Sequence, residues 1–257
     1  IAMTEPGAGS DLQGIKTTAV KDDLTDDYIL SGSKTFITNG QSFDFVIVAA
    51  KTNQTVPVSK GISLFIVDDF YEGVIKGKKL KKIGLHSADT SEIYFEDVTV
   101  PTVKLLGEAD HGFITLMKEL PQERTILAVA AIGAMEGALQ WTVQYIKERE
   151  AFGQPLGKLQ VIRHKIAEMM TELRVNRAFV NECLTLLGQK QLTASEASMA
   201  KLSSTEAQGR IVDGCLQLFG GYGYMEEYPI SRAYTDARVQ RIYGGTSEIM
   251  KEIISKD

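Results

Sequence analysis

The chain has 257 residues, of which 44% are hydrophobic and 24% are charged, and a formal net charge of -5. This composition is typical of a globular protein long enough for two cores, and the negative charge argues against a nucleic-acid-binding surface. No apolar run predicts a membrane span, which needs about 18 residues. The two cysteines, Cys183 and Cys215, lie in apolar helical contexts, which favours inert buried thiols and a reducing compartment.

Residues 1–102 carry the pattern of a β domain. The segment 28–38 alternates polar and apolar residues and ends at Asn39-Gly40, a strong signal for a tight turn. Shorter apolar runs at 43–50, 62–67 and 93–100 are separated by polar turn residues. This spacing predicts a small antiparallel β-barrel or sandwich over residues 1–102.

Residues 103–257 carry a helical pattern instead. Apolar residues recur at helical period over 112–150, 158–188, 193–219 and 246–255. We therefore predict an α+β fold, in which the antiparallel β domain is followed by a four-helix bundle.

The first of these helical segments is rich in Ala and Gly, so another backbone or a flat ligand can approach it closely. Pro121 suits the first turn of the helix, which puts the pair Glu123-Arg124 at its head. We expect this carboxylate to have a partner or a task, because acidic residues are seldom buried without one. The competing interpretation is that Glu123 only favours the positive N-terminal end of the helix.

Other segments offer groups that bind ligands, although each signal is weak alone. Thr4–Asp11 combines glycines with two hydroxyls in a loop suited to a phosphate or a polar ring edge. Phe36–Thr38 ends an apolar strand. Phe219–Tyr224 contains glycines that let a flat group come close, but a helix C-cap explains them equally well. Arg149 either pairs with a phosphate or lies in solvent near a helix C-terminus. The three histidines have no metal-ligand spacing, so no metal site is predicted.

Taken together, the order and spacing of six motifs resemble the acyl-CoA dehydrogenase family over essentially the whole chain. The resemblance implies a middle β domain followed by a C-terminal helical bundle. It also explains the start at Ile-Ala-Met-Thr, since the family has an N-terminal helical domain of which we expect nothing to be present. The motifs are Thr4-Glu5-Pro6-Gly7-Ala8-Gly9-Ser10-Asp11, Phe36-Ile37-Thr38-Asn39-Gly40, Phe95-Glu96-Asp97-Val98-Thr99-Val100-Pro101, Arg149-Glu150-Ala151-Phe152-Gly153, Gln217-Leu218-Phe219-Gly220-Gly221 and Ile242-Tyr243-Gly244-Gly245-Thr246.

The resemblance implies an FAD-dependent enzyme that introduces a trans α,β double bond into an acyl-CoA thioester. Flavin and pyrophosphate contacts would come from Thr4, Gly9 and Ser10, and the segment Phe36, Ile37 and Thr38 would lie against the flavin ring. A third set matches positions that hold the adenine half of FAD or form the cofactor loop near the chain end: Arg149, Phe152, Gln160, Gln217, Phe219, Gly220, Gly221, Thr246 and Glu248. Substrate contacts would come from Ser10, Arg124, Tyr243 and Gly245.

The resemblance also implies partners. Along a helix rising about 1.5 Å per residue, Glu123 and Arg149 lie about 39 Å apart, too far for one FAD to meet both readily. This distance agrees with the family arrangement in which Arg149 serves the cofactor of a neighbouring subunit, so we expect a homo-oligomer built as a dimer of dimers. The implied electron acceptor is an electron-transfer flavoprotein. The implied location is the mitochondrial matrix in a eukaryote or the cytoplasm in a bacterium.

One position departs from the family pattern. Most members carry the catalytic glutamate after the Tyr of Ile-Tyr-Glu-Gly-Thr, where this chain has Gly244. Three alternatives follow: a non-catalytic binder of FAD or acyl-CoA, a flavin oxidase, or a dehydrogenase whose base lies elsewhere. The long-chain and isovaleryl branches carry the base immediately before the Arg of the long helix, which here is Glu123. We therefore expect Glu123 as the base, with Glu136 as the runner-up, and a long-chain or branched acyl-CoA as the substrate. The N–H of Gly244 would still donate to the thioester oxygen.

Overall fold

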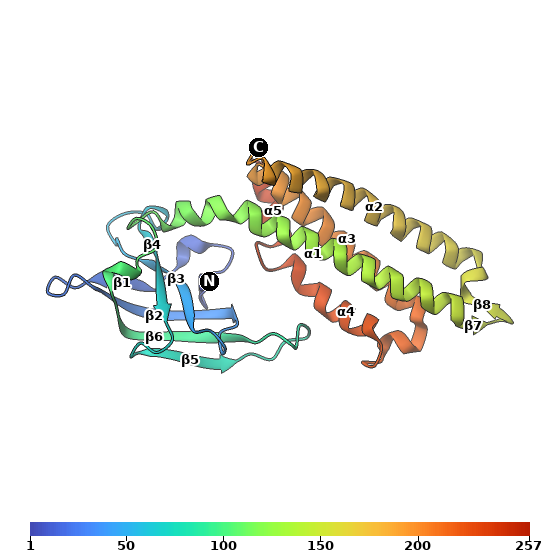
Figure 1. Ribbon diagram of the computed structural model, residues 1–257, viewed down its shortest axis with the longest axis horizontal. Helices are drawn as coiled ribbons and strands as arrows, with labels where there is room; N and C mark the ends of the chain where they lie inside the picture. The colour runs from blue at the N-terminus through green and yellow to red at the C-terminus, as the bar shows by residue number, and fades with distance from the viewer. The chain divides into compact units, whose positions relative to one another are not determined.

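The computed structural model describes all 257 residues, and the chain divides into two compact units. The first comprises Ile1–Lys82 and His86–Lys118, and the second comprises Ile83–Leu85 and Glu119–Asp257. The first unit contains the long strands and the second contains most of the helical residues (Figure 1). The division falls inside the longest helix, whereas the predicted domain boundary follows residue 102, where strands give way to helices.

A single six-stranded sheet forms the first unit, with the strand order β4-β3-β1-β2-β6-β5. Paired neighbours are antiparallel except β1 and β3, which are parallel. The predicted β domain is confirmed in this form, as one sheet with edge strands β4 and β5 rather than a closed barrel or two packed sheets. The strands are β1 (Thr18–Lys21), β2 (Tyr28–Thr38), β3 (Phe45–Lys51), β4 (Ile62–Asp68), β5 (Val74–Lys79) and β6 (Thr90–Val100).

The strands β1 and β5 were not predicted, and their burial explains why. Strand β5 has no buried residue and β1 has one, Ala19, so neither shows the alternation that marks a half-buried strand. The other four strands carry the core of the unit. Its fully buried apolar side chains include Leu30, Val48, Phe65, Val67, Ile93, Val98 and Val100.

The second unit is helical. Helix α3 packs against α2, α4 and α5, and side chains from α1 to α4 share one apolar core. The four predicted helices are confirmed, and α4 is an additional one. The helices are α1 (Gly112–Glu148), α2 (Gln160–Gly188), α3 (Ala194–Phe219), α4 (Pro229–Ala237) and α5 (Ser247–Ile254), and strands β7 (Glu150–Ala151) and β8 (Gln154–Pro155) form the hairpin between α1 and α2. Short 3-10 helices lie at Leu12–Gly14, Val58–Lys60, Thr102–Lys104, Leu156–Lys158, Gly220–Tyr224 and Arg238–Arg241.

Helix α1 begins well before Pro121, which lies inside the helix. The expectation that Pro121 occupies the first turn is therefore wrong. A proline inside a helix lacks one backbone N–H, and its own carbonyl here accepts a hydrogen bond from Thr125 Oγ1 at 2.8 Å. Because Glu123 comes after Pro121, it is also remote from the helix N-terminus. The alternative that Glu123 serves the helix dipole, whose effect falls off after the first turn, is excluded.

Cys183 and Cys215 are free and buried in the core of the helical unit. Burial raises the pKa of the Cys215 thiol to about 11, and burial is also the main cause of the raised pKa of Cys183. Both thiols are therefore protonated at neutral pH and poorly nucleophilic. The prediction of inert buried cysteines is confirmed in these respects.

Helix α1 contains an 18-residue apolar window, of which 39% is buried. By length and composition alone this helix could cross a bilayer, so the expectation that no such run exists is wrong. Glu136 is the only charged residue between Arg124 and Lys147, and it interrupts what would otherwise be one unbroken uncharged run. Core helices of soluble proteins can be equally long and apolar, and the window by itself does not indicate a membrane protein.

Candidate functional site

In the first unit, a buried ion pair fastens the glycine-containing loop 4–11 to strand β2. Lys34 Nζ donates to Glu5 Oε1 at 2.8 Å and to the carbonyl of Met3 at 3.0 Å. The Lys34 side chain is fully buried and that of Glu5 is 6% exposed. The Glu5 carboxylate also accepts the backbone N–H groups of Lys16 and Thr17, at 2.6 and 3.0 Å. The Glu5 carboxylate thus links the start of the loop to β2 and to residues 16–17, which follow the loop.

The pKa values of Glu5 and Lys34 are shifted by burial and by the charge of the partner. Burial alone would raise the pKa of Glu5, but hydrogen bonds from Lys34, Thr17 and the Lys16 amide outweigh it, and the pKa lies below its usual value. Burial lowers the pKa of Lys34, and Glu5 opposes that effect. The Glu5 carboxyl is therefore ionised at neutral pH, and its charge favours the protonated form of Lys34.

The loop and the end of β2 are brought together within the first unit. Thr35 N–H donates to the carbonyl of Thr4 at 2.9 Å, and β2 bulges between Lys34 and Ile37. At the bulge Phe36 adopts a left-handed φ of 58°, and its ring is 67% exposed. Ile37 is 4% exposed, so the predicted cofactor contact at this position has little accessible surface. The predicted residues Gly9, Ser10 and Thr38 are exposed, and Thr4 is half-buried.

In the second unit, two buried cations bind the carbonyls of consecutive glycines in the loop before α5. Arg124 on α1 donates from Nε to the carbonyl of Gly244 at 3.5 Å, and Lys201 on α3 donates from Nζ to the carbonyl of Gly245. Arg124 is 6% exposed and Lys201 is fully buried. Neither forms an ion pair with a carboxylate. Arg124 also donates to Ser198 Oγ at 3.4 Å.

The same loop leaves three successive backbone donors unused. The N–H groups of Gly244, Gly245 and Thr246 make no hydrogen bond within the chain. Gly244 and Gly245 both have left-handed φ angles, 63° and 98°, and Gly244 and Gly245 are half-buried. Successive N–H groups in such conformations form a concave set of donors suited to a negative oxygen. The Thr246 hydroxyl is used locally, because it accepts the N–H of Ile249 and caps α5.

Glu123 is exposed and directly precedes Arg124 on α1, whose side chain contacts the glycine loop. Tyr243 is half-buried, and burial raises its pKa. Glu248 is exposed in the first turn of α5. Glu136, the runner-up base, instead forms an ion pair with Arg177 on α2, which is the ordinary structural role of a mid-helix glutamate.

A second group of predicted residues lines a cavity of about 600 Å³ in the helical unit. Arg149 makes no ion pair and lies 5.7 Å from the centre of the Tyr222 ring, while the Tyr145 and Phe219 rings stack at 4.2 Å. A free guanidinium, aromatic faces and an open glycine turn suit an anionic ligand with a flat ring. The lining residues are Tyr145, Arg149, Leu156, Ile162, Gln217, Leu218, Phe219, Gly220, Gly221, Tyr222 and Met225.

Two of the residues predicted to hold the adenine half of FAD lie outside this cavity lining, as do Thr246 and Glu248 of the predicted cofactor loop. Phe152 is 90% exposed in the β7–β8 hairpin with a left-handed φ of 53°, and Gln160 is exposed at the start of α2. The cavity thus unites only Arg149 with Gln217, Phe219, Gly220 and Gly221. Phe152 and Gln160 do not line this cavity, and their part in holding the adenine half of FAD stays a prediction.

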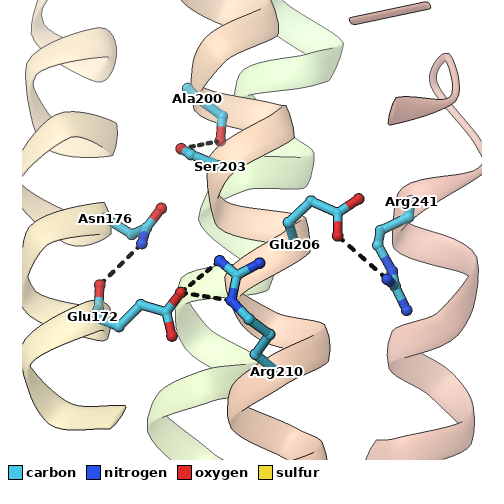
Figure 2. Close-up of polar contacts among 7 residues, drawn as sticks. All are labelled: Glu172, Asn176, Ala200, Ser203, Glu206, Arg210 and Arg241. Atoms are coloured by element: carbon cyan, nitrogen blue, oxygen red, sulfur yellow. Dashed lines mark hydrogen bonds and ion pairs between the residues drawn. The ribbon is translucent and has the colours of Figure 1, made fainter. Parts of the chain in front are cut away.

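A polar network on α3 fixes the residue that follows the glycine loop. Glu206 accepts Ser247 Oγ at 2.6 Å and Arg241 Nη1 at 3.3 Å, so it ties α3 to both flanks of the loop. Figure 2 shows Glu206 directed toward Arg241, with a separate pair between Glu172 on α2 and Arg210 on α3. Glu206 is held ionised by these donors, which bring its pKa below the usual value against the effect of burial.

Sequence reasoning missed Lys201, Ser198 and Glu206. A signal for Lys201 existed, because it lies four residues after Ala197 and three before Ser204, on the buried small-residue face of α3. A lysine on such a face is unusual and needs a partner. The pattern alone does not say that the partner is a loop carbonyl 44 residues further along the chain.

The fold and these two sites define a protein in which a β-sheet unit precedes a helical unit. The helical unit bears a loop of free backbone donors and a cavity lined by aromatic rings and an unpaired arginine. Its family follows from comparison with known proteins. The family model described as "Acyl-CoA dehydrogenase, middle domain" matches residues 1–98, and "Acyl-CoA dehydrogenase, C-terminal domain" matches residues 110–257. The chain belongs to the acyl-CoA dehydrogenase family.

Similar proteins agree with this assignment. The mitochondrial long-chain specific acyl-CoA dehydrogenase of Sus scrofa is 54% identical over all of this chain and 60% of its own length. The caffeyl-CoA reductase-Etf complex subunit CarC of Acetobacterium woodii is 43% identical over 99% of this chain and 66% of its own. The crystal structure of an acyl-CoA dehydrogenase from Geobacillus kaustophilus is 48% identical and superposes with a TM-score of 0.97, covering 99% of this chain and 67% of that one. This chain thus spans about 60% of the length of its mammalian relatives.

Proposed function

We propose that the whole protein is an FAD-dependent acyl-CoA dehydrogenase that converts an acyl-CoA thioester to the trans-2-enoyl-CoA. The observation that carries this proposal is the junction of α1 with the glycine loop. There Arg124, which directly follows Glu123 on α1, contacts a loop whose N–H groups at Gly244, Gly245 and Thr246 make no hydrogen bond within the chain. Removal of a proton α to a carbonyl requires a general base and hydrogen-bond donors to the carbonyl oxygen.

The residues present fit the cofactor. In the helical unit the cavity with the unpaired Arg149 suits a nucleotide, and Gln217 to Gly221 would hold its ring and phosphate. In the β unit the exposed Phe36 ring and the anchored loop 4–11 would hold the flavin. FAD, when bound, supplies the acceptor for the hydride that leaves the substrate β-carbon. The prediction that Arg149 serves a neighbouring subunit's cofactor is retained as part of this proposal.

The remaining steps, which are charge stabilisation and proton transfer, are assigned to residues of the chain itself. The N–H of Gly244 donates to the thioester oxygen and stabilises the negative charge that grows there as the α-proton leaves. The Glu123 carboxylate accepts that proton, and the electron pair of the broken C–H bond forms the α,β double bond as the β-hydrogen departs as hydride. Glu123 ends the step protonated and returns its proton to water. Arg124 fixes the loop and balances the charge of Glu123.

We infer a long-chain or branched acyl chain, an electron-transfer flavoprotein as electron acceptor, and a homo-oligomer arranged as a dimer of dimers. The choice of substrate is supported by the 54% identity with a protein named long-chain specific acyl-CoA dehydrogenase. The name of the Acetobacterium woodii relative includes an Etf complex, which supports the acceptor. A mitochondrial location in a eukaryote follows the mammalian relatives, whose names state it, and a bacterial protein would lie in the cytoplasm.

A second candidate is the reverse reaction, reduction of an enoyl-CoA. It is supported by the 43% identity with a protein named a reductase. The same residues serve either direction, because Glu123 in its protonated form would donate the α-proton. A flavin oxidase would differ from the proposed dehydrogenase in its electron acceptor, which is oxygen. A non-catalytic binder of FAD or acyl-CoA would differ in having no turnover.

Assays of the purified whole protein separate these functions. We expect a flavin absorption spectrum, and oxidation of acyl-CoA thioesters with a dye acceptor much faster than with oxygen, fastest for long or branched chains. Faster turnover with oxygen would indicate the oxidase. Reduction of an enoyl-CoA by reduced dye, without measurable oxidation of the saturated thioester, would indicate the reductase. Flavin binding without turnover in any of these assays would leave the non-catalytic binder.

A further inference from the structure

We propose that Lys201 is a positioning residue that, with Arg124, turns the glycine loop so that its backbone donors face the substrate. This inference rests on the proposed function and adds a residue that the family motifs do not single out. Lys201 lies on α3 and donates from Nζ to the carbonyl of Gly245, next to the carbonyl that Arg124 binds. Two cations from two helices thus hold adjacent peptide groups of the same loop.

Because peptide groups are planar, the two hydrogen bonds also set the directions of two backbone N–H groups in the loop. The peptide group is planar and trans, so its N–H points opposite to its C=O. Because the carbonyl of Gly244 is drawn toward Arg124, the N–H of Gly245 points the other way. Because the carbonyl of Gly245 is drawn toward Lys201, the N–H of Thr246 does the same. Both N–H groups make no hydrogen bond within the chain. The two hydrogen bonds therefore hold the carbonyl side of the loop inward and leave the N–H groups of Gly245 and Thr246 free. They also fix the backbone that directly follows the N–H of Gly244, the proposed donor to the thioester oxygen.

The loop needs these two hydrogen bonds to keep its conformation, because its two consecutive glycines are flexible. Gly244 and Gly245 have left-handed φ angles of 63° and 98°, and glycine has the greatest freedom of any residue to leave such a conformation. Thr246 caps α5, and Ser247 is held by Glu206 at 2.6 Å, so the end of the loop is fixed independently. Lys201 and Arg124 supply the only side-chain hydrogen bonds to Gly244 and Gly245 themselves.

The surroundings of Lys201 are unfavourable for a purely structural lysine. Its side chain is fully buried, it has no carboxylate partner, and only one of its three N–H donors has an acceptor. Burial is the main cause that lowers its pKa to about 8, and the positive charge of Arg124 lowers it further, against Glu206 and Glu248. A buried cation without a carboxylate generally destabilises a fold relative to an apolar side chain of similar size. Its retention here is explained if the charge acts on the loop.

The test compares Lys201→Met with Lys201→Gln in the whole protein loaded with its cofactor, and with Lys165→Met, an exposed lysine on α2, as control. Lys201→Met keeps the length of the side chain but removes the donor, and Lys201→Gln keeps a neutral donor. We expect Lys201→Met to lower kcat by about 10- to 100-fold, less than the loss caused by removing an oxyanion donor itself. KM for acyl-CoA and the amount of bound flavin should change little. Lys201→Gln should recover part of kcat, and Lys165→Met should behave as wild type.

Two readouts separate positioning from a structural role. If the charge acts on the loop, Lys201→Met should leave Tm unchanged or raise it while kcat falls, whereas a structural lysine would lower Tm and leave kcat per bound flavin unchanged. A crystal structure of the variant should show the Gly245 carbonyl turned away from its wild-type direction. An unchanged loop, or unchanged kcat, would overturn the inference. If the wild-type protein has no acyl-CoA activity, the proposed function fails, and the position of the loop in Lys201→Met still decides whether the lysine holds it.

Discussion

A Cβ atom placed on Gly244 would lie 2.5 Å from Cδ1 of Leu127. Leu127 lies on α1, one turn after Glu123, so the helix that carries the proposed base also fills the space that a side chain at position 244 would occupy. A non-glycine residue at Gly244 would in addition be strained by about 1–2 kcal/mol, because φ is 63°. Position 244 therefore favours glycine, and any side chain there would have to displace Leu127.

The first prediction concerns the base. Glu123→Gln removes the proton acceptor but keeps the size and polarity of the side chain, so we expect turnover to fall by about 10²- to 10⁴-fold, the usual contribution of a general base. Flavin content and the Kd of a non-reactive acyl-CoA analogue should stay near wild type. Glu119→Gln, an exposed glutamate one turn earlier on α1, is the matched control. Retention of most activity by Glu123→Gln, with loss in Glu136→Gln, would show that the base is the runner-up.

The second prediction uses the contact with Leu127. Adding Gly244→Glu to Glu123→Gln moves the carboxylate to the position used by most of the family, and we expect it to restore a small part of kcat. Adding Leu127→Ala as well should restore more, because it removes the atom that meets the new Cβ. Leu127→Ala in the wild-type background measures the cost of the lost leucine alone. Equal rescue with and without Leu127→Ala would show that the leucine simply rotates aside.

The third prediction concerns Arg149 in the cavity. Arg149→Ala removes an unpaired guanidinium, so FAD binding should weaken by about 10- to 100-fold, the equivalent of about 1.5–3 kcal/mol for a charged hydrogen bond. If the cofactor belongs to a neighbouring subunit, the oligomer should also dissociate at higher protein concentration, because ligand binding and assembly are linked. Sedimentation at several concentrations measures this. Arg163→Ala, exposed on α2, is the control, and flavin loss with an unaffected oligomer would argue against a shared site.

Regular patterns and family motifs predicted the main elements because their causes are local. Strand β2 alternates its burial and α3 places small residues on one face, and both features are visible in the sequence. The position of Pro121 within α1 was misjudged, since packing tolerates this proline inside a helix where propensity alone would place it at an end. The partner of Lys201 could not be predicted from the sequence, for a different reason. A hydrogen bond to a carbonyl 44 residues away depends on how α3 packs against the last loop, which no local pattern encodes.

The last prediction tests the buried pair that anchors the loop 4–11. Glu5→Gln leaves Lys34 buried without its counter-charge, and Lys34→Met leaves Glu5 buried in the same way, so each should lower the free energy of unfolding by about 3–5 kcal/mol. The double variant should be less unstable than the sum of the two, because no lone charge is left behind. The exposed pair Lys21 and Asp26 is the control, with an expected effect below about 1 kcal/mol.

The pH dependence of this pair has a defined sign. The pKa of Glu5 is lower in the folded chain than its ordinary value of 4.5, so its stabilising effect is complete above about pH 4.5 and is lost as the pH falls toward the folded pKa. The difference in urea midpoint between wild type and Glu5→Gln should therefore be constant from pH 7 to about pH 5 and shrink below that. Flavin release should follow the same trend if the anchored loop holds the cofactor. If the difference in urea midpoint does not change between about pH 6 and about pH 3.5, ionisation of Glu5 is not what stabilises the fold.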